Sequence, residues 1–272
     1  MISVLMAVYA GDRAPWLAAA LASLQDQTTP AQQVVVVEDG PIEPAVAGVL
    51  EDFAGRLPLT RVALPTNQGL AAALQAGLER CEFDLVARAD ADDICTPGRL
   101  GRQLEVMSAQ PDLSALGGLV AEFDEDPEHP YAVRPVATGR ATVARRARWR
   151  CPLNHPTVMF RRADVLAVGG YSGYVGIEDY YLWGKLLAGG YHLDNLAEVL
   201  VLQRAGAALG RRRGGWRYAK TEVGLLRGLV DLGFLSRGQA VVGGLLRVPV
   251  RLVPSALRVL LYNRALRRRL EG

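Results

Sequence analysis

The stretch that decides the fold is VVVVEDGP, residues 34–41, in which four valines precede two acids and a Gly-Pro pair. A short β-branched run that ends in turn-forming residues is typical of a strand buried on both faces. Outward from it, similar apolar runs predict further strands at residues 2–8, 59–64 and 84–89. Helical patterns fill the intervals at residues 14–25, 43–53 and 68–80. This alternation predicts an α/β fold with a mostly parallel sheet flanked by helices.

The second half of the chain continues the pattern less regularly. We expect, in chain order, a helix at 97–107, a strand at 113–120, an irregular polar segment at 122–135, a basic helix at 138–148, a strand at 155–160, a helix at 179–188 and an extended run at 191–202. A glycine-rich loop between residues 169 and 176 leads into the last of these helices.

Composition bounds the class of protein. The chain has 272 residues, of which 50% are apolar and 22% charged, which excludes a disordered or collagen-like chain. Cys81, Cys95 and Cys151 are too far apart in the sequence for a CxxC metal site, so we expect reduced thiols and a cytoplasmic protein. The N-terminal residues MISVLMAVYAGD lack a basic region, and no signal peptide is predicted.

Charge is divided unevenly along the chain. Residues 1–200 carry 16 Lys and Arg against 25 Asp and Glu, whereas residues 201–272 carry 15 against 3. The apolar run 240–261 is interrupted too often to supply the ~20 residues of a membrane span. The interruptions are Arg247, Pro249, Arg251, Pro254 and Arg258.

This basic, apolar end instead predicts helices that lie on an anionic membrane surface, with Leu257, Leu260 and Leu261 turned toward the lipid. Nucleic acid is the weaker interpretation, because the segment has few aromatic residues for stacking. We therefore expect a peripheral protein on the inner face of the cell membrane and no nucleic-acid partner.

Two acids follow the strand predicted at residues 84–89. In an extended chain Asp90 and Asp92 project to the same side, and converging carboxylates bind Mg²⁺ or Mn²⁺ through hard oxygen ligands. A divalent ion there could hold a diphosphate. The alternative is a solvated acidic turn in which Asp93 or Thr96 caps the next helix.

Two further acidic sites strengthen the first interpretation. Asp39 ends another strand of the same predicted sheet, where open α/β sheets bind ligands, although an aspartate before Gly-Pro also suits a turn. Glu178 and Asp179 begin a helix after the glycine-rich loop, where acids also serve as caps or dipole partners.

Six blocks of sequence, taken together and in this order, resemble family 2 glycosyltransferases of the bacterial polysaccharide and cell-envelope branch. They are SVLMAVYAGD (3–12), VVVVEDGP (34–41), LPTNQGLAAALQAGL (64–78), LVARADADD (85–93) with PGRL (97–100), NHPTVMFRR (154–162) and GGYSGYVGIEDYYLWGKLLAGG (169–190). The resemblance covers about residues 2 to 204. It implies the GT-A fold, a Rossmann-like, mixed and mostly parallel sheet flanked by helices.

The resemblance also implies a nucleotide-sugar site. The backbone of Ala7, Val8 and Tyr9 matches the segment that cradles the nucleoside, and Asp39 matches the acid that binds the base. The remaining matched donor-side residues are Asn67, Gly69, Arg88, Asp90, Ala91 and Asp92. Asp90 and Asp92 match the DxD pair that contacts the ribose and the Mn²⁺ or Mg²⁺ ion.

On the acceptor side, Asp179 matches the general base of the ED motif and His155 matches a position near the acceptor, although a lone histidine before a strand also suits a structural hydrogen bond. Glu178 and Trp183 are assigned to the same side, and Trp183 either stacks on an acceptor sugar or packs in the core. Many relatives carry a metal-binding histidine after the late strand, but residues 203–207 contain none. The ion would then be held by carboxylate, diphosphate and water, or residues Arg211 to Arg213 would close over the diphosphate.

These expectations define a reaction and its rivals. We expect a GT-A domain at 1–205, with a nucleotide-sugar half at about 1–110 and an acceptor half at 111–205, and a basic helical membrane-association extension at 206–272. A single displacement with one base inverts the anomeric carbon. The donor would be a nucleotide sugar, UDP-linked, and the acceptor a glycan or lipid-linked glycan; a homodimer is compatible with the sequence.

Two alternatives remain open. One is a Mg²⁺-dependent nucleotidyl or phosphoryl transferase, although the sequence contains neither GxGxxG nor GxxxxGK. The other is a catalytically silent membrane scaffold that binds a sugar nucleotide, against which the four aspartates argue.

Overall fold

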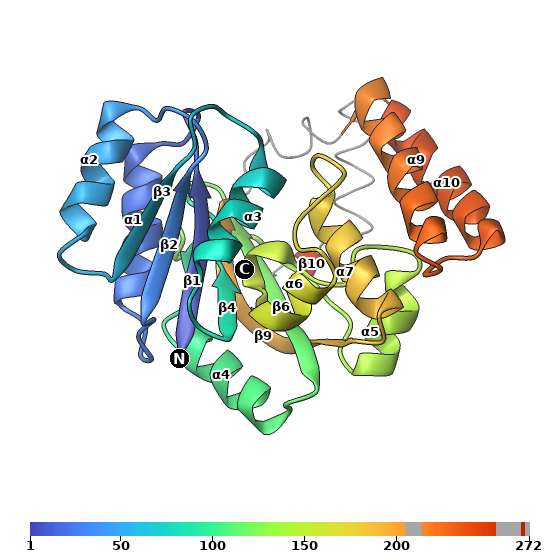
Figure 1. The fold of residues 1–272 in the computed structure, drawn as a ribbon, viewed down its shortest axis with the longest axis horizontal. Coiled ribbons are helices and arrows are strands. Elements are labelled where there is room, and N and C mark those ends of the chain that lie inside the picture. The colour runs from blue at the N-terminus through green and yellow to red at the C-terminus, as the bar shows by residue number, and fades with distance from the viewer. Residues whose placement is uncertain (205–213, 254–267, 270–272) are drawn as a thin grey trace.

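The structure is a computed structural model that describes residues 1–204, 214–253 and 268–269 (Figure 1). Its sheet runs in the order β10-β7-β6-β8-β4-β1-β2-β3, with β9 beside β6 and β5 beside β9. In chain order, the first four strands are β1 (Ile2–Val8), β2 (Gln33–Glu38), β3 (Leu59–Ala63) and β4 (Leu85–Arg88). All of them pair in parallel, and the predicted parallel sheet is confirmed.

Alternating side chains of this sheet enter two cores. Ile2, Val4 and Met6 of β1 face one side, whereas Leu5 faces the other. The first side is covered by α1 (Ala14–Gln25), α2 (Pro44–Phe53) and α4 (Arg99–Ala109), and the second by α3 (Leu70–Arg80), α6 (Arg162–Ala167) and α7 (Glu178–Ala188). Because both faces are covered, every residue of the valine run is fully buried.

The strands between residues 113 and 204 complete a mixed sheet. The long strand β6 (Leu113–Phe123) runs parallel to β9 (His192–Arg204) and antiparallel to β7 (Ala132–Arg134) and β8 (Met159–Arg161). β5 (Ile94–Cys95) pairs with β9, and the backbone of β10 (Arg268–Arg269) pairs with β7. Strands β5, β7 and β10 are additions to the expected elements.

The strand expected at residues 155–160 is partly wrong. Residues His155–Thr157 form the 3₁₀ turn η1, and the strand begins only at Met159. Pro156 lacks the N–H that a ladder position requires, so the segment turns before it can pair. The basic helix α5 (Arg140–Ala147) occurs where it was expected.

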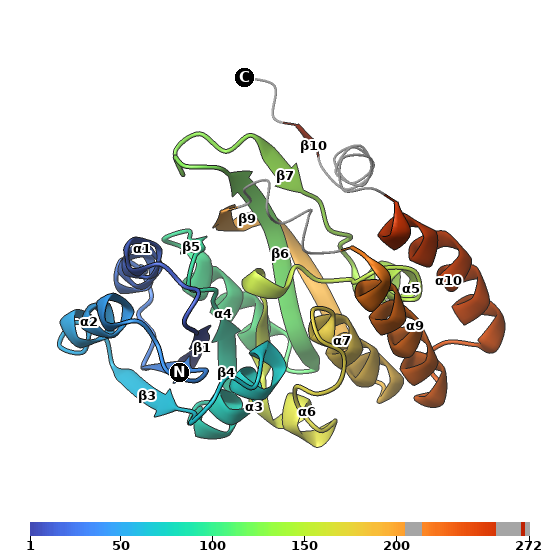
Figure 2. The same cartoon turned by 90° about the horizontal axis from the view of Figure 1, so that it is seen from above.

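The C-terminal extension begins as a helical hairpin at the edge of the molecule, beyond α7 (Figures 1 and 2). It consists of α9 (Trp216–Asp231) and α10 (Arg237–Leu252), and Ser236 and Gln239 form a capping box at the start of α10. Leu225 and Leu229 of α9 pack with Tyr180 of α7 in one apolar cluster. The helical extension is therefore confirmed and is joined to α7 by an apolar cluster of its own.

Parts of the predicted extension lie outside the described residues, namely Arg211 to Arg213 and the segment containing Leu257, Arg258, Leu260 and Leu261. In the part of the chain that the structure describes, no helix combines the length and apolar character that crossing a membrane requires. Pro249 lies inside α10, which continues to Leu252, so it does not divide the run as expected.

Candidate active site

A cleft of about 800 Å³ opens where the parallel strands end, which is within the usual size of a small-molecule site. It is bounded by the first turn of α7, by the segment before η1, and by one wall of the α9–α10 hairpin. Thirteen of the fourteen residues expected at the site line it: Ala7, Val8, Tyr9, Asp39, Asn67, Gly69, Arg88, Asp90, Ala91, Asp92, His155, Glu178 and Asp179. The exception is Trp183.

Asp39 organises the loop that enters α3. Its carboxylate accepts hydrogen bonds from the backbone N–H groups of Gln68 at 2.6 Å and Gly69 at 2.9 Å. Gly69 adopts φ +87, a conformation that side chains other than glycine's rarely allow. A carboxylate offers about four acceptor positions, so Asp39 keeps capacity for a donor in the cleft. Its expected role toward a base remains a prediction.

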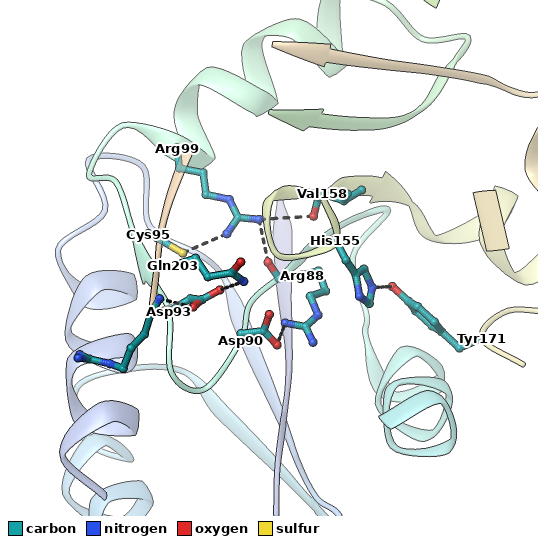
Figure 3. Close-up of polar contacts among 10 residues, drawn as sticks. Arg88, Asp90, Asp93, Cys95, Arg99, His155, Val158, Tyr171 and Gln203 are labelled. Atoms are coloured by element: carbon teal, nitrogen blue, oxygen red, sulfur yellow. Dashed lines mark hydrogen bonds and ion pairs between the residues drawn. The ribbon is translucent and has the colours of Figure 1, made fainter. Parts of the chain in front are cut away.

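Arg88 and Asp90 both line the cleft and form an ion pair (Figure 3). Arg88 is only 1% exposed, and its carbonyl accepts a hydrogen bond from Arg99 Nη2 at 2.7 Å. Arg99 is equally buried and also donates to Cys95 Sγ at 3.1 Å and Gln103 Oε1 at 3.1 Å. This second arginine, which the PGRL block contained without an assigned role, fixes the backbone that leads to Asp90.

Negative charge accumulates around the Asp90-Ala91-Asp92 segment. Burial, together with the charges of Asp92 and Asp90, raises the pKa of Asp12 to about 6, although the N–H of Tyr9 stabilises its ionised form. Burial and the same two charges raise the pKa of Asp93 well above its usual value. Asp12 belonged to the first sequence block, but only the folded structure places its charge beside the DxD pair.

The alternative interpretation of the acidic turn as a helix cap does not match the contacts. Asp93 accepts hydrogen bonds from Gln203 Nε2 at 3.0 Å and from the N–H of Arg204 at 3.1 Å (Figure 3). Thr96 donates to the carbonyl of Leu200 at 3.2 Å. Both side chains therefore tie the turn to β9, and α4 begins without a side-chain cap.

The carboxylates fit a divalent ion that takes part of its coordination from a ligand. Within the described residues, no three His, Cys, Asp or Glu side chains are grouped closely enough to hold a metal alone. Asp90 and Asp92 supply hard oxygen donors. Burial first, and then the charges of Asp92 and Asp90, raise the pKa of Asp12, and a cation would relieve the part that those two charges cause. Mg²⁺ in particular commonly binds through one or two carboxylates plus phosphate and water.

Asp179 occupies the first turn of α7 and is half-buried. The thiol of Cys151 donates to its Oδ2 at 3.5 Å, and its Oδ1 accepts from the N–H of Tyr180 at 2.8 Å. Burial, and then the charge of Asp179, raises the pKa of Cys151 well above its usual value, so the thiol stays protonated and able to donate. Glu178 accepts from the N–H of Gly176 at 2.6 Å and holds the glycine-rich loop.

His155 and Trp183 behave differently from each other. His155 lines the cleft, and its Nε2 lies 3.0 Å from the hydroxyl of Tyr171 (Figure 3). Desolvation, and then the charge of Arg88, lowers the pKa of His155 well below its usual value. Trp183 is 0% exposed and packs edge-on against His155, so its expected contact with an acceptor is wrong. The helix turns this ring into the core beneath the sheet.

Several lining residues escaped the sequence analysis. Trp149 exposes 42% of its surface in the cleft wall. The others that matter for charge and shape at this end are Arg146, Arg150, Tyr218, Arg247 and Arg251. The arginines of α5 and α10 were visible in the sequence, but their spacing alone does not tell which face of each helix lines a cleft.

A mixed sheet whose parallel strands end in carboxylates at one open edge is typical of nucleotide-binding α/β enzymes. Within that class, a family model described as glycosyl transferase family 2 matches residues 3–169. The chain belongs to glycosyl transferase family 2.

Several relatives match nearly the whole chain, among them one from Erwinia amylovora and one from Escherichia coli. The amylovoran biosynthesis glycosyltransferase AmsE of Erwinia amylovora is 38% identical over 97% of this chain and 98% of that protein. The UDP-Gal:alpha-D-GlcNAc-diphosphoundecaprenol beta-1,3-galactosyltransferase of Escherichia coli is 34% identical over 98% of this chain and 96% of that protein. Both alignments are long enough to include the α9–α10 hairpin.

Solved structures share the fold. The mannosyltransferase PcManGT of Pyrobaculum calidifontis, in complex with GDP-Man and Mn²⁺, superposes with a TM-score of 0.67 at 20% identity, covering 97% of this chain and 75% of that one. S. aureus TarS 1–349, in complex with UDP-GlcNAc, gives 0.60 at 19% identity, covering 97% and 87%. The expected GT-A fold is confirmed.

Proposed function

We propose that the protein transfers a sugar from a UDP-linked donor to a lipid-linked glycan acceptor, with inversion at the anomeric carbon. The observation that carries the proposal is the gathering of Asp39, Asp90, Asp92 and Asp179, from separate stretches of chain, around one cleft. The UDP-Gal donor and diphosphoundecaprenol acceptor in the name of the E. coli relative support this choice of substrates.

The donor half supplies binding and orientation. The Asp39 carboxylate is fixed by two backbone N–H groups, and in this proposal its remaining acceptor capacity receives the imide N–H of a uracil ring. Asp90 and Asp92 would hold Mn²⁺ or Mg²⁺, and the ion, when bound, neutralises charge that develops on the leaving diphosphate. The Arg88–Asp90 pair keeps that segment in place from below.

Asp179 is the proposed general base. A half-buried carboxylate at the acceptor end can take the proton of an acceptor hydroxyl as that oxygen attacks the anomeric carbon. One base and one displacement produce inversion. Glu178 is committed to the amide of Gly176, so it positions the loop next to the base.

Membrane association is part of the proposal and is supported by the outer surface of α10. Val241, Val242, Leu245 and Leu246 are 62%, 45%, 71% and 65% exposed and lie along one side of the helix. A helix with such a face and a basic remainder suits an anionic lipid surface. The cytoplasmic membrane face is where a lipid-linked acceptor and a soluble nucleotide sugar meet.

The test is a screen that measures release of UDP, dTDP or GDP from a panel of nucleotide sugars, followed by two substitutions. Asp179→Asn should lower kcat by about 100-fold or more while UDP affinity stays unchanged. Asp92→Asn should abolish the effect of Mn²⁺ on UDP affinity measured by calorimetry.

Other outcomes separate the rivals. Sugar-independent diphosphate or phosphate release would support the nucleotidyl or phosphoryl transferase. Nucleotide-sugar binding with no turnover on any acceptor would support the silent scaffold. Full activity in Asp179→Asn would remove this residue as the base.

A further inference from the structure

A cluster of arginines lines the cleft at its acceptor end. Arg146 comes from α5, Arg150 follows that helix, and Arg247 and Arg251 lie one turn apart on α10. None of them belongs to the sequence blocks that carry the donor site. Their charge therefore needs a separate explanation.

The two arginines of α10 are held in place from behind. Glu222 of α9 is 0% exposed, forms an ion pair with Arg247, and accepts from Arg251 Nε at 3.1 Å. The guanidinium of Arg247 lies 4.9 Å from the ring centroid of Tyr180, and that of Arg251 lies 4.7 Å from that of Tyr218. One carboxylate serves two guanidinium groups, so this triad keeps a net positive charge.

Arg247 has hydrogen-bonding capacity left over. Its Nη1 is buried and makes no hydrogen bond within the described part of the chain. A buried guanidinium N–H without an acceptor is costly, and a ligand oxygen would satisfy it. The planar fork of arginine matches phosphate oxygens, and here stacking on an aromatic ring has already fixed its orientation.

The cluster also lies next to the proposed base. Arg247 stacks on the ring of Tyr180, which directly follows Asp179 in α7, and its charge opposes the rise in the pKa of Cys151 that burial causes. The same thiol donates to Asp179. A phosphate group bound at Arg247 would therefore lie within reach of a sugar whose hydroxyl is presented to Asp179.

Helix α10 joins this cluster to a lipid-facing surface. Arg247 and Arg251 line the cleft, whereas Val241, Leu245 and Leu246 of the same helix are mostly exposed to solvent. A ligand with an apolar chain, a phosphate-containing head and a terminal sugar would span these features in that order. The geometry matches the chemistry of a lipid diphosphate.

We infer that Arg247 and Arg251, together with Arg146 and Arg150, form a subsite for the diphosphate group of a lipid-linked sugar acceptor. The inference rests on the proposed function and adds the group by which the acceptor is held. It assigns this diphosphate to a place separate from the donor diphosphate at Asp90 and Asp92.

The experiment titrates octyl diphosphate into the full-length enzyme that has first been saturated with UDP and Mn²⁺. Filling the donor site in advance distinguishes the two diphosphate sources. We expect the probe to bind the saturated enzyme and Arg251→Gln and Arg247→Gln each to weaken it by about tenfold or more, the scale of one charge-assisted hydrogen bond. Octyl glucoside, which has the same alkyl chain but no phosphate, should bind weakly to the wild type and to every variant.

Matched controls keep the result interpretable. Arg237→Gln removes an exposed charge from the same helix outside the cleft and should leave probe affinity unchanged. If a single glutamine variant unfolds, two other variants replace it. The double variant Glu222→Gln with Arg251→Gln substitutes neutral groups for both members of the ion pair. Arg251→Lys keeps the positive charge but lacks the planar guanidinium group. Each should still bind UDP normally and the probe weakly.

Two results would overturn the subsite: loss of all probe binding when UDP is present, which would assign the probe to the donor site, or equal probe affinity in wild type and arginine variants. UDP binding is measured first and alone, so its absence would count against the proposed donor. The probe is then titrated without nucleotide, and its dependence on Arg247 and Arg251 still tests the subsite.

Discussion

His155 shows at the level of one residue how the fold sets protonation beside the cleft. Desolvation and the charge of Arg88 lower the pKa of His155, so the folded protein holds the neutral ring. Below about pH 6.5 the unfolded chain binds a proton at this position and the folded chain does not. The free energy of unfolding therefore falls as the pH drops, by up to about 1.4 kcal/mol per unit from this group.

His155→Gln should remove that component, because glutamine can still bond the hydroxyl of Tyr171 and does not titrate. Urea unfolding at pH 7.5 and pH 5.5 measures it. His129 acts with the opposite sign, since its hydrogen bond to Asp126 raises its pKa, and it is unchanged between the two proteins. An equal loss of stability on acidification in both proteins would contradict the assignment.

At the level of elements, Glu222 holds two helices together, because its ion pairs join α9 to α10. Its carboxylate is fully buried and serves Arg247 and Arg251. Removing one partner of a buried pair leaves charge uncompensated and typically costs about 3 to 5 kcal/mol. We expect Glu222→Gln to loosen the hairpin and to increase amide hydrogen exchange in α10 by an order of magnitude or more, while exchange in β1 and β2 stays slow.

Asp231→Asn is the matched control, since it removes an exposed acid from the end of the same helix. It should leave the exchange of α10 as in wild type. A uniform rise in exchange across the whole protein in Glu222→Gln would mean that the ion pair stabilises the entire fold rather than the hairpin.

The elements also differ in how far the sequence determined them. The valine run of β2 is apolar on both faces, so its strand and parallel neighbours could be predicted from residue type alone. Strand β8 is short and follows Pro156, and its place between β4 and β6 depends on partners distant in the sequence. Local patterns contain no information on such pairing.

The same distinction applies to the site. Asp39 and Asp90 could be found because strand ends converge at one edge of a parallel sheet. Trp183 could not be placed, since either side of α7 would accommodate an aromatic ring until packing chose the core. The role of Arg247 and Arg251 could not be predicted, because the side of α10 that faces the cleft is fixed by ion pairs to Glu222 of another helix.

At the scale of the whole molecule, the hairpin connects the cleft to a surface. Its inner wall contributes Tyr218, Arg247 and Arg251 to the cleft, so the extension predicted only for membrane association also lines the candidate site. Its outer side carries an apolar stripe. In the proposed membrane-bound state, this single helix would fix the orientation of the molecule, with the proposed acceptor end of the cleft beside the lipid.

The proposed orientation predicts that the apolar stripe on α10 is needed for membrane binding but not for folding or for UDP binding. The triple substitution of Val241, Leu245 and Leu246 by serine should lower flotation with vesicles containing anionic lipid by about tenfold or more. Each side chain is at least 62% exposed, so its loss removes little buried area, and the unfolding temperature and UDP affinity should stay near wild type. Val175→Ser changes a residue 74% exposed outside the hairpin and should not affect flotation. Undiminished flotation of the triple variant would show that another part of the chain holds the protein to the lipid, and α10 would then owe its apolar stripe to some other contact.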